Sequence, residues 1–313
     1  MIDVCVVSRR SEAIDIDSFE LERVDGAPLP PFTAGAHIDV HLRSGLTRQY
    51  SLCNGPHDTR RYRIGVLKDP ASRGGSQAMH ALQVGDTLSI SEPRNLFPLV
   101  ADAKYSMLFA GGIGITPILC MARELFNRGA PFELHYCTRS VDRMAFLKEL
   151  REAGFAHRVF FHFDDTPSKL DAAKVLEQPM IGSQLYVCGP NGFMNAVLGT
   201  AEQLNWPADH LHREYFAAPV VQRSAGSFDV VLNSTGETYH IPDGKSVVEV
   251  LAESGIEIPV SCEQGICGTC LTKVLDGTPD HRDMFMTQEE HQRNNQFTPC
   301  CSRAKSPRLV LDL

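Results

Sequence analysis

Short runs of alternating apolar and polar residues, separated by turn-forming clusters, fill the first hundred positions of the chain. Examples are HIDVHL at 37–42, RRYRIGVL at 60–67 and DTLSISEP at 86–93. Alternation with a period of two is typical of half-buried strands, and short strands at this spacing favour antiparallel pairing. The pattern predicts an antiparallel β-barrel domain over residues 1–101.

The pattern changes over residues 102–222, where apolar runs that predict buried strands alternate with stretches that predict helices. The strands are expected in YSMLFAGG at 105–112, FELHYCTRS at 132–140, RVFFHFDD at 158–165 and SQLYVCGP at 183–190. TPILCMARELFNRG predicts a helix with Thr116 as N-cap, Pro117 at the first helical position and Gly129 just past the end. Such alternation indicates an α/β domain with a doubly wound parallel sheet.

A third segment, predicted as a domain over 226–313, follows the linker-like stretch VVQRSAGS. FDVVLNSTGETYHIP predicts a hairpin, SVVEVLAESG a short helix and RLVLDL a closing strand. This segment has 7 Lys and Arg against 13 Asp and Glu, a net charge of −6 out of −8 for the whole chain. The chain therefore has an acidic end, and its overall charge argues against a nucleic acid as partner.

Two further observations bear on where the protein works. No run of 18 apolar residues occurs, so we expect no membrane-spanning helix. The start, MIDVCVVSRR, lacks the long apolar core and cleavage site of a signal peptide, which favours the cytoplasm. In that compartment the ten cysteines are expected to be buried thiols, ligands or reactive groups rather than disulfides.

The strongest chemical signal is CEQGICGTC at 262–270, which contains Cys262, Cys267 and Cys270 at C-x4-C-x2-C spacing. With a fourth cysteine downstream, at Cys300 or Cys301, this is the ligand pattern of a plant-type 2Fe-2S cluster. A structural zinc site is the alternative, but such sites favour paired C-x2-C units, and only one is present. The segment resembles plant-type ferredoxins over its whole length, which implies a β-grasp fold.

A glycine-rich stretch, AGGIGITP at 110–117, joins a predicted strand to a predicted helix. Gly111, Gly112 and Gly114 allow close backbone approach, and a helix N-terminus offers free amides to a phosphate. It departs from the G-x-G-x-x-G pattern, and a tight turn with no ligand is the alternative. CGP at 188–190 ends a later strand of the same sheet, where ligands of such sheets bind, so we expect both motifs to face one crevice.

Two motifs in the barrel segment fit a flavin. RQYS at 48–51 offers Arg48 to a phosphate and Tyr50 and Ser51 to a flat ring, although an ordinary barrel strand is the better explanation of this motif taken alone. SRGGS at 72–76 adds a glycine-rich anion site with Arg73 beside it.

The barrel motif R-x-Y-S, the motifs G-G-x-G-x-T-P and C-G-P, and the ferredoxin-like end, in this order, resemble the phthalate dioxygenase reductase family over the whole chain. This resemblance implies an FMN-containing reductase that passes electrons from NADH through a 2Fe-2S cluster to a Rieske-type oxygenase or demethylase. It implies cofactor contacts from the following residues: Arg48, Tyr50, Ser51, Val66, Leu67, Lys68, Gly74, Gly75, Ser76, Gly111, Gly112, Gly114, Thr116, Thr138, Arg139, Ser140, Cys188, Gly189, Pro190 and Phe216. The alternative for Phe216 is that it is only an aromatic residue of the linker, and the alternative for residues 138–140 is that they form an ordinary strand end.

The order of carriers explains why a flavin is needed, because NADH gives up two electrons as a hydride and the cluster accepts one at a time. No side chain has to act as acid, base or nucleophile, so we name no catalytic residue. One alternative is an FAD enzyme serving another acceptor, and another is a non-catalytic electron carrier. NADPH is a further alternative to NADH, since Arg139 is able to meet a 2′-phosphate and Asp164 or Asp165 a ribose.

The sequence also predicts which of two adjacent cysteines completes the cluster. In an extended segment their side chains would point to opposite faces, so only one would reach the irons. Matching TPCCSRA to the plant-type pattern places Cys300 at the ligand position. Cys301 then takes the place of a small apolar residue.

Overall fold

The computed structural model describes residues 1–42, 45–70, 72, 74–178, 180–216 and 226–313. The chain forms two compact units, Met1–Glu214 and Tyr215–Leu313, and each is described by itself. The first unit contains two separate sheets, an antiparallel one and a parallel one. The boundaries of the three predicted domains stay predictions.

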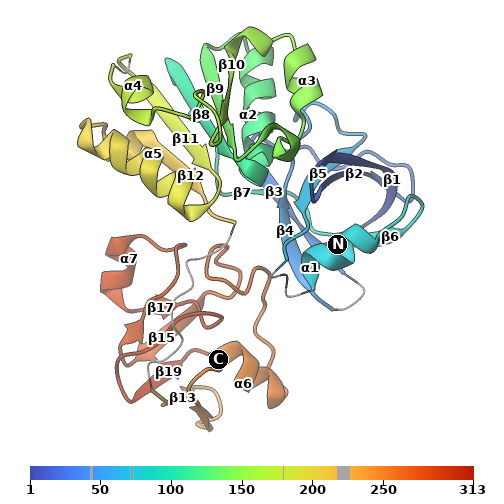
Figure 1. The fold of residues 1–313 in the computed structure, drawn as a ribbon. Helices are drawn as coiled ribbons and strands as arrows, with labels where there is room; N and C mark the ends of the chain where they lie inside the picture. The colour runs from blue at the N-terminus through green and yellow to red at the C-terminus, as the bar shows by residue number, and fades with distance from the viewer. Residues whose placement is uncertain (43–44, 71, 73, 179, 217–225) are drawn as a thin grey trace. The chain divides into compact units, whose positions relative to one another are not determined.

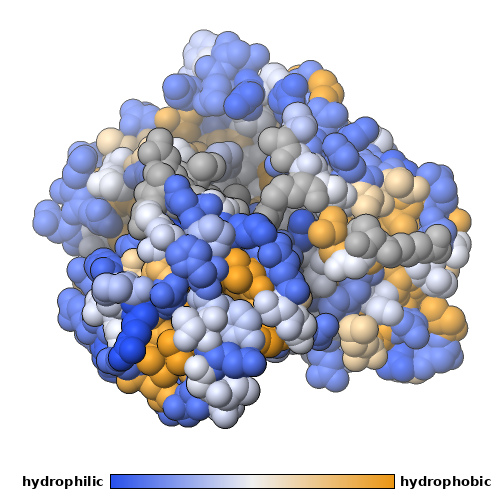
Figure 2. Space-filling model, turned by 90° about the horizontal axis from the view of Figure 1, so that it is seen from below, coloured by the Kyte–Doolittle hydropathy of each residue, from blue (hydrophilic) through white to orange (hydrophobic). Residues whose placement is uncertain are grey.

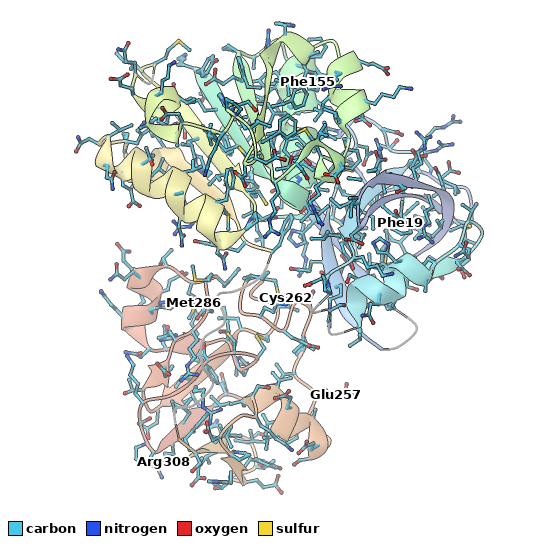
Figure 3. All side chains as sticks on the ribbon, viewed as in Figure 1. Phe19, Phe155, Glu257, Cys262, Met286 and Arg308 are labelled. Atoms are coloured by element: carbon cyan, nitrogen blue, oxygen red, sulfur yellow. The ribbon has the colours of Figure 1, made fainter. Side chains whose placement is uncertain are left out.

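The antiparallel sheet is the predicted barrel. Its strands are β1 (Ile2–Ala13), β2 (Ile16–Arg23), β3 (Ala36–His41), β4 (Thr47–Ser51), β5 (Tyr62–Leu67), β6 (Thr87–Ile90) and β7 (Arg94–Asn95). The order is β4-β3-β6-β1-β2-β5, with β7 beside β3. An antiparallel bridge between Leu52 and Ile64 brings the two ends of this order together, which closes the barrel. Phe19, labelled in Figure 3, is fully buried in it.

A short helix in the barrel segment, α1 (Gly75–Ala81), had no counterpart in the sequence-based prediction. Gly74 precedes it with φ +94°, a conformation that glycine adopts without strain. The SRGGS stretch therefore leads directly into a helix rather than forming a turn alone.

The parallel sheet has the order β10-β9-β8-β11-β12, so the chain starts in the middle and moves outward to both edges. Its strands are β8 (Tyr105–Gly111), β9 (Phe132–Thr138), β10 (Val159–Phe163), β11 (Ser183–Cys188) and β12 (Leu211–Glu214). Helices α2 (Ile115–Asn127) and α3 (Leu147–Glu152) lie on one side in Figure 1, and α4 (Ala172–Leu176) and α5 (Asn191–Gln203) on the other. This is the predicted doubly wound arrangement.

The start of α2 differs from the sequence-based prediction. The helix begins at Ile115, directly after a 3-10 turn at Gly112–Gly114, so Thr116 lies inside the helix and not at its N-cap. Its hydroxyl donates to the Ile113 carbonyl, 3.1 Å away, instead of accepting from a helix amide. The glycine-rich turn fills the capping region that a threonine would otherwise occupy. Gly129 follows the helix with φ +67°, as expected.

The second unit is the predicted β-grasp domain. Its main sheet has the order β14-β13-β19-β15-β17, with β13 parallel to β19. The elements are β13 (Phe228–Leu232), β14 (Thr238–Ile241), α6 (Val247–Glu253), β15 (Thr272–Asp276), β16 (Pro279–Asp280), α7 (Gln288–Arg293), β17 (Gln296–Phe297), β18 (Arg303–Ala304) and β19 (Arg308–Leu311). Ser246 and Glu249 cap α6 reciprocally, which fixes the start of this helix.

Each unit has its own core. The core of the first unit runs without interruption from the barrel, including Ile38 and Ile64, into the parallel sheet, including Ile115 and Tyr136. The barrel and the parallel sheet therefore pack as one body. Hydrophilic residues cover much of the face shown in Figure 2, with hydrophobic ones in patches between them. Among the described residues, no helix combines the length and the apolar character that crossing a membrane would require.

Candidate functional site

The loop Cys262–Cys270 holds three of the predicted cluster ligands. Cys262, Cys267, Cys270 and Cys300 are all buried, with 4–7% of their surface exposed. Hydrogen bonds join the side chains of Cys262 and Cys267, and those of Cys270 and Cys300. The fold therefore gathers all four predicted ligands in pairs, and Cys262 is labelled in Figure 3.

Two glycines allow this loop to close. Gly265 and Gly268 have φ of +73° and +70°. A Cβ atom at Gly265 would lie 2.4 Å from the Cys301 sulfur, and one at Gly268 would lie 2.3 Å from the Phe285 ring. Any larger residue at either position would collide with its neighbour.

Backbone amides of the loop point at the sulfurs. The amide of Gln264 donates to the Cys262 Sγ at 3.3 Å, and that of Thr269 donates to the Cys267 Sγ at 3.5 Å. Amide donors stabilise thiolates, the form in which cysteine binds iron. Four buried thiols with amide donors, and no histidine among them, fit a 2Fe-2S cluster.

Cys300 and Cys301 lie in a turn and not in the extended segment that the sequence suggested. The amides of Cys301 and Ser302 both donate to the Thr298 carbonyl, at 3.2 and 2.9 Å. Cys300 is buried beside Cys270, whereas Cys301 is half-buried with its sulfur 3.3 Å from the Thr298 hydroxyl. The side chains of Cys300 and Cys301 are hydrogen-bonded to each other, so the turn does not send them to opposite faces, and Cys300 stays the predicted fourth ligand because its side chain meets that of Cys270.

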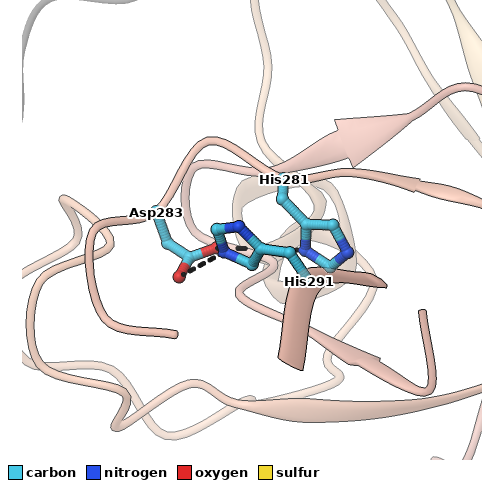
Figure 4. Close-up of side chains that lie close together, drawn as sticks. All are labelled: His281, Asp283 and His291. Atoms are coloured by element: carbon cyan, nitrogen blue, oxygen red, sulfur yellow. Dashed lines mark hydrogen bonds and ion pairs between the residues drawn. The ribbon is translucent and has the colours of Figure 1, made fainter. Parts of the chain in front are cut away.

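A second group of polar side chains in the same unit, His281, Asp283 and His291, is shown in Figure 4. The His291 Nε2 lies 3.2 Å from both Asp283 oxygens, and the two imidazole rings stack with centroids 4.4 Å apart and planes 14° apart. A metal ion binds a ring nitrogen in the plane of the ring, so two nearly parallel rings cannot share one. Asp283 also accepts from the Met286 amide at 2.8 Å, which indicates a structural role.

In the first unit, the two predicted nucleotide motifs are in contact. A Cβ atom at Gly114 would lie 2.2 Å from the Cys188 carbonyl oxygen, and one at Gly111 would lie 2.7 Å from the Phe193 ring. The turn after β8 and the end of β11 therefore pack against each other, at the carboxyl edge where doubly wound sheets bind ligands, and a shared nucleotide crevice stays a prediction. Burial raises the pKa of the Cys188 thiol well above its usual value, so the thiol stays neutral.

The predicted phosphate-binding residues of the barrel also lie together. The Arg48 side chain passes over Gly75, where an added Cβ would lie 2.6 Å from its Cγ and 2.7 Å from its Nε. Arg48 thus lies beside the first turn of α1, whose N-cap Gly74 offers no side chain to the helix amides. A guanidinium beside open amides fits a phosphate group. Arg73 lies outside the described residues.

The remaining predicted flavin residues follow β4 and β5. Tyr50 is half-buried against the core, Val66 is buried, and Leu67 and Lys68 are exposed. The Ser76 hydroxyl accepts from the Asp69 amide at 3.1 Å. These residues lie on neighbouring parts of the barrel, but their contacts with a flavin stay a prediction.

Thr116 connects the barrel to the nucleotide crevice. It is almost fully buried, and its Cγ2 would lie 2.8 Å from a Cβ atom at Gly65. Gly65 directly precedes Val66 in β5. The first turn of α2 therefore contacts the strand predicted to hold the flavin, which places the two predicted binding regions side by side.

The predicted adenosine-binding residues, Thr138, Arg139 and Ser140, lie at the end of β9. Gly111 is in register with Cys137, so this strand end adjoins the glycine-rich turn. The Thr138 hydroxyl donates to the Ser140 carbonyl at 2.9 Å, and Arg139 is exposed. Pro190 is exposed in the first unit, and Phe216 is exposed in the second.

The sequence-based analysis missed Glu214, the last residue of β12. Its Oε2 accepts from the Ser51 hydroxyl at 3.0 Å, and its strand position is in register with Cys188. Part of its surface is exposed, but protein surrounds the carboxyl, and this burial raises its pKa to about 8. The signal available in the sequence was an acidic residue at the carboxyl end of the short strand LHRE.

Glu214 should make stability depend on pH. Because the folded pKa is about 8 and the usual value is 4.5, the folded protein holds this proton more tightly than the unfolded chain does. The group's contribution to stability is therefore full below about pH 4.5 and falls as pH rises to about 8. Glu214→Gln does not titrate, so its melting temperature should rise by a few degrees relative to wild type between these values. A constant difference across this range would contradict the assignment.

Arg48→Ala should purify with its iron–sulfur absorbance but with little flavin, because alanine cannot replace the planar fork of a guanidinium on a phosphate. The flavin-to-iron ratio of the purified protein measures this. Arg61→Ala, which removes an exposed arginine paired with Glu22 on the barrel surface, is the control and should keep its flavin. Full flavin occupancy in Arg48→Ala would make Arg48 an ordinary strand residue.

Comparisons with known proteins agree with this geometry. Residues 230–305 match the 2Fe-2S iron-sulfur cluster binding domain family, and residues 108–198 match the oxidoreductase NAD-binding domain family. The chain is 60% identical over 317 residues to the vanillate O-demethylase oxidoreductase of Pseudomonas putida, with 100% of both chains covered. It is 41% identical to the phthalate dioxygenase reductase of Burkholderia cepacia, with 98% of this chain and 96% of the relative covered.

A solved structure gives the same result for the fold. It is described as phthalate dioxygenase reductase, a modular structure for electron transfer from pyridine nucleotides to a 2Fe-2S centre. The TM-score is 0.80 at 41% sequence identity, with 100% of this chain and 98% of the other covered. These findings confirm the resemblance drawn from the three ordered motifs. The chain belongs to the phthalate dioxygenase reductase family.

Proposed function

We propose that this protein oxidises NADH and passes the electrons singly, through a 2Fe-2S cluster, to the oxygenase component of a two-protein demethylase. The observation that supports this most directly is the contact between the first turn of α2, which follows the glycine-rich turn, and β5 of the barrel, made by Thr116 and Gly65. It brings a nucleotide crevice and a flavin strand together in one unit. The loop Cys262–Cys270, together with Cys300, would hold the one-electron carrier in the second unit.

The residues of the chain would bind and orient the carriers. FMN, when bound, accepts a hydride and releases single electrons, which is the chemistry that the protein itself lacks. Arg48 and the first turn of α1 would hold its phosphate, and the turn at Gly111–Gly114 would hold the pyrophosphate of NADH. Ser51 at the end of β4 and Glu214 at the end of β12 are joined by a hydrogen bond. No side chain has to transfer a proton for the hydride step.

FMN is favoured over FAD by the short stretch after the phosphate loop. Helix α1 starts at Gly75 and the chain returns to the barrel in β6 at Thr87, which leaves little chain to hold an adenine. The mass of the extracted flavin decides between the two. FAD would support the alternative of a reductase serving a different acceptor protein.

The partner is an oxygenase component, and the 60% identical relative is named a vanillate O-demethylase oxidoreductase. We therefore propose an oxygenase that demethylates a methoxylated aromatic acid such as vanillate. Purified oxygenases for vanillate and for phthalate, each mixed with this reductase and NADH, would distinguish the two substrate classes by product formation.

The ligand thiols must be reduced to bind iron, which favours the cytoplasm as the place of work.

The central test is to mix the purified protein with NADH in the absence of oxygen. We expect the flavin absorbance to bleach first and the cluster absorbance to follow. A higher specificity constant with NADPH than with NADH would reverse the proposed nucleotide preference. If the spectrum is unchanged with both nucleotides, the protein is not an NAD(P)H-dependent reductase and the proposed function is wrong. A non-catalytic electron carrier would then be the remaining alternative.

The acidic second unit suggests how the oxygenase binds. From Gly226 onward the net charge is −6, so we propose that this unit docks on a basic patch of the oxygenase. Because salt screens such attraction, the second-order rate of oxygenase reduction should fall several-fold between about 0.05 M and 0.5 M salt. Flavin reduction by NADH, measured alongside, should change little. A rate of oxygenase reduction that is independent of salt would exclude this docking mode.

A further inference from the structure

A cavity of about 810 Å³ lies within the first unit, between the barrel and helices α2 and α3 of the parallel sheet. Charged side chains from both parts line it, among them Glu12 of β1, Arg63 of β5, Arg123 of α2 and Glu149 of α3. None of these residues belongs to the predicted flavin or nucleotide sites.

These four side chains form a continuous chain of ion pairs across the cavity. Arg63 pairs with Glu12 through Nη2 at 2.7 Å and with Glu149 through Nη1 at 2.6 Å. The other oxygen of Glu149 pairs with Arg123. Only 10% of the Arg63 side chain is exposed, so water screens these pairs weakly.

Arg63 also packs on an aromatic ring that reaches the predicted flavin strand. Its guanidinium lies over the Phe146 ring, 4.8 Å from the centroid. Arg63 and Gly65 are two residues apart in β5, so they share a face of the strand. A Cβ atom at Gly65 would lie 3.3 Å from the Phe146 ring and 2.8 Å from the Thr116 Cγ2. Arg63, Phe146 and Thr116 thus lie along one face of β5.

Helix α2 is consequently linked to β5 at two places, directly at its first turn and through Glu149 of α3 further along. Thr116, in its first turn, contacts Gly65, and Arg123 joins the ion pairs seven residues later. Residues seven apart in a helix lie on the same face, two turns from each other. The first contact alone would leave the helix free to pivot. The second contact fixes its direction, and with it the glycine-rich turn that precedes the helix.

We propose that the Glu12–Arg63–Glu149–Arg123 ion pairs set the spacing between the flavin strand and the NADH-binding turn, and that Arg63 is a positioning residue for hydride transfer. Hydride transfer requires reacting atoms about 3–3.5 Å apart, and a misplacement of about 1 Å costs roughly 100-fold in rate. A buried guanidinium that bridges two carboxylates resists such a displacement because each pair holds the other in place. This inference rests on the proposed function.

The test measures flavin reduction in a single turnover at saturating NADH, using the full chain with its cofactors. Arg63→Met keeps much of the side-chain volume and removes the charge. We expect its rate constant for flavin reduction to fall at least 10-fold, with unchanged flavin content and NAD⁺ affinity. The deuterium isotope effect with NADH labelled at the transferred hydrogen should stay at least as large as in wild type. If the substitution only destabilised the protein, the amplitude of flavin reduction or the flavin content would fall, and the rate constant would stay normal.

Two further variants complete the experiment. Arg61→Met is the matched control, because Arg61 precedes β5, is 50% exposed, and pairs with Glu20 and Glu22 of the barrel. Its rate constant should equal that of wild type. Glu149→Gln removes the shared carboxylate and should slow flavin reduction as Arg63→Met does. If Arg63→Met does not fold, this variant tests the proposal in its place. A wild-type rate constant in either variant would overturn the proposal. Absence of flavin reduction in wild type would instead overturn the proposed function.

Discussion

Cys300→Ser should purify with its flavin but without its 2Fe-2S cluster, and electron transfer to the oxygenase should fall to the background rate. Cys300 is buried beside Cys270, in the unit that holds the other three predicted ligands. A serine oxygen is a poor substitute for a thiolate on iron. Reduction of the flavin by NADH should continue at the wild-type rate, because the residues predicted to serve it, apart from Phe216, lie in the other unit. Visible absorbance measures the flavin, iron content measures the cluster, and single-turnover kinetics measure the rates of flavin reduction and of electron transfer to the oxygenase.

Cys301→Ser is the matched control, since it makes the same chemical change one residue further on. Cys301 is half-buried, and its sulfur lies 3.3 Å from the Thr298 hydroxyl, so a serine hydroxyl can keep this contact. The cluster colour and electron transfer should be retained, and Cys301→Val should retain them as well. If Cys301→Ser loses the cluster while Cys300→Ser keeps it, the ligand assignment is wrong by one residue.

Gly114→Ala should lower the rate of flavin reduction by NADH by roughly 100-fold, with the cluster unaffected. The added Cβ would lie 2.2 Å from the Cys188 carbonyl oxygen and 2.6 Å from the Gly189 nitrogen. Both are backbone atoms, so no side-chain rotation relieves the collision. The turn or the end of β11 must move, and these are the two walls of the crevice. Single-turnover reduction and NAD⁺ binding by calorimetry measure the loss.

Gly192→Ala is the control for this substitution. Gly192 lies in the first turn of α5 in the same sheet region, and a Cβ there would meet no atom within 4 Å. Alanine is a better helix former than glycine, so this variant should be as active as wild type and slightly more stable. Normal flavin reduction in Gly114→Ala would show that the crevice does not bind the nucleotide.

The sequence by itself determined the features that depend on local spacing. The C-x4-C-x2-C loop requires a tight turn, and the glycines at 265 and 268 have the positive φ that such a turn needs. The apolar runs of β8, β9 and β11 predict buried parallel strands, and these strands are buried because both of their faces are covered, whereas β10, at the sheet edge, buries only Val159 and was wrongly expected to be buried. Hydrophobic periodicity and the positions of glycines depend only on residues close together in the sequence. They can therefore be interpreted without knowing which distant residues pack against the segment.

The local sequence pattern was a less reliable guide to backbone conformation where hydrogen bonds from adjacent residues favoured a different conformation. Thr116 is of a residue type that favours the N-cap position, but after the glycine-rich turn the helix starts at Ile115, two residues earlier than predicted. TPCCSRA was expected to be extended, but the carbonyl of Thr298 accepts two amides and forms a turn. In both cases backbone hydrogen bonds from adjacent residues decided between two conformations that the side chains alone permit.

Only the tertiary structure decided which distant residues meet. Ser51 and Glu214 are 163 positions apart, and Arg63 and Glu149 are 86 apart. Their contacts arise because the barrel and the parallel sheet share one core, which brings the ends of β4 and β12 together and places β5 against α2 and α3. A charged residue at a strand end gives no indication of its partner, since the partner depends on how two sheets pack.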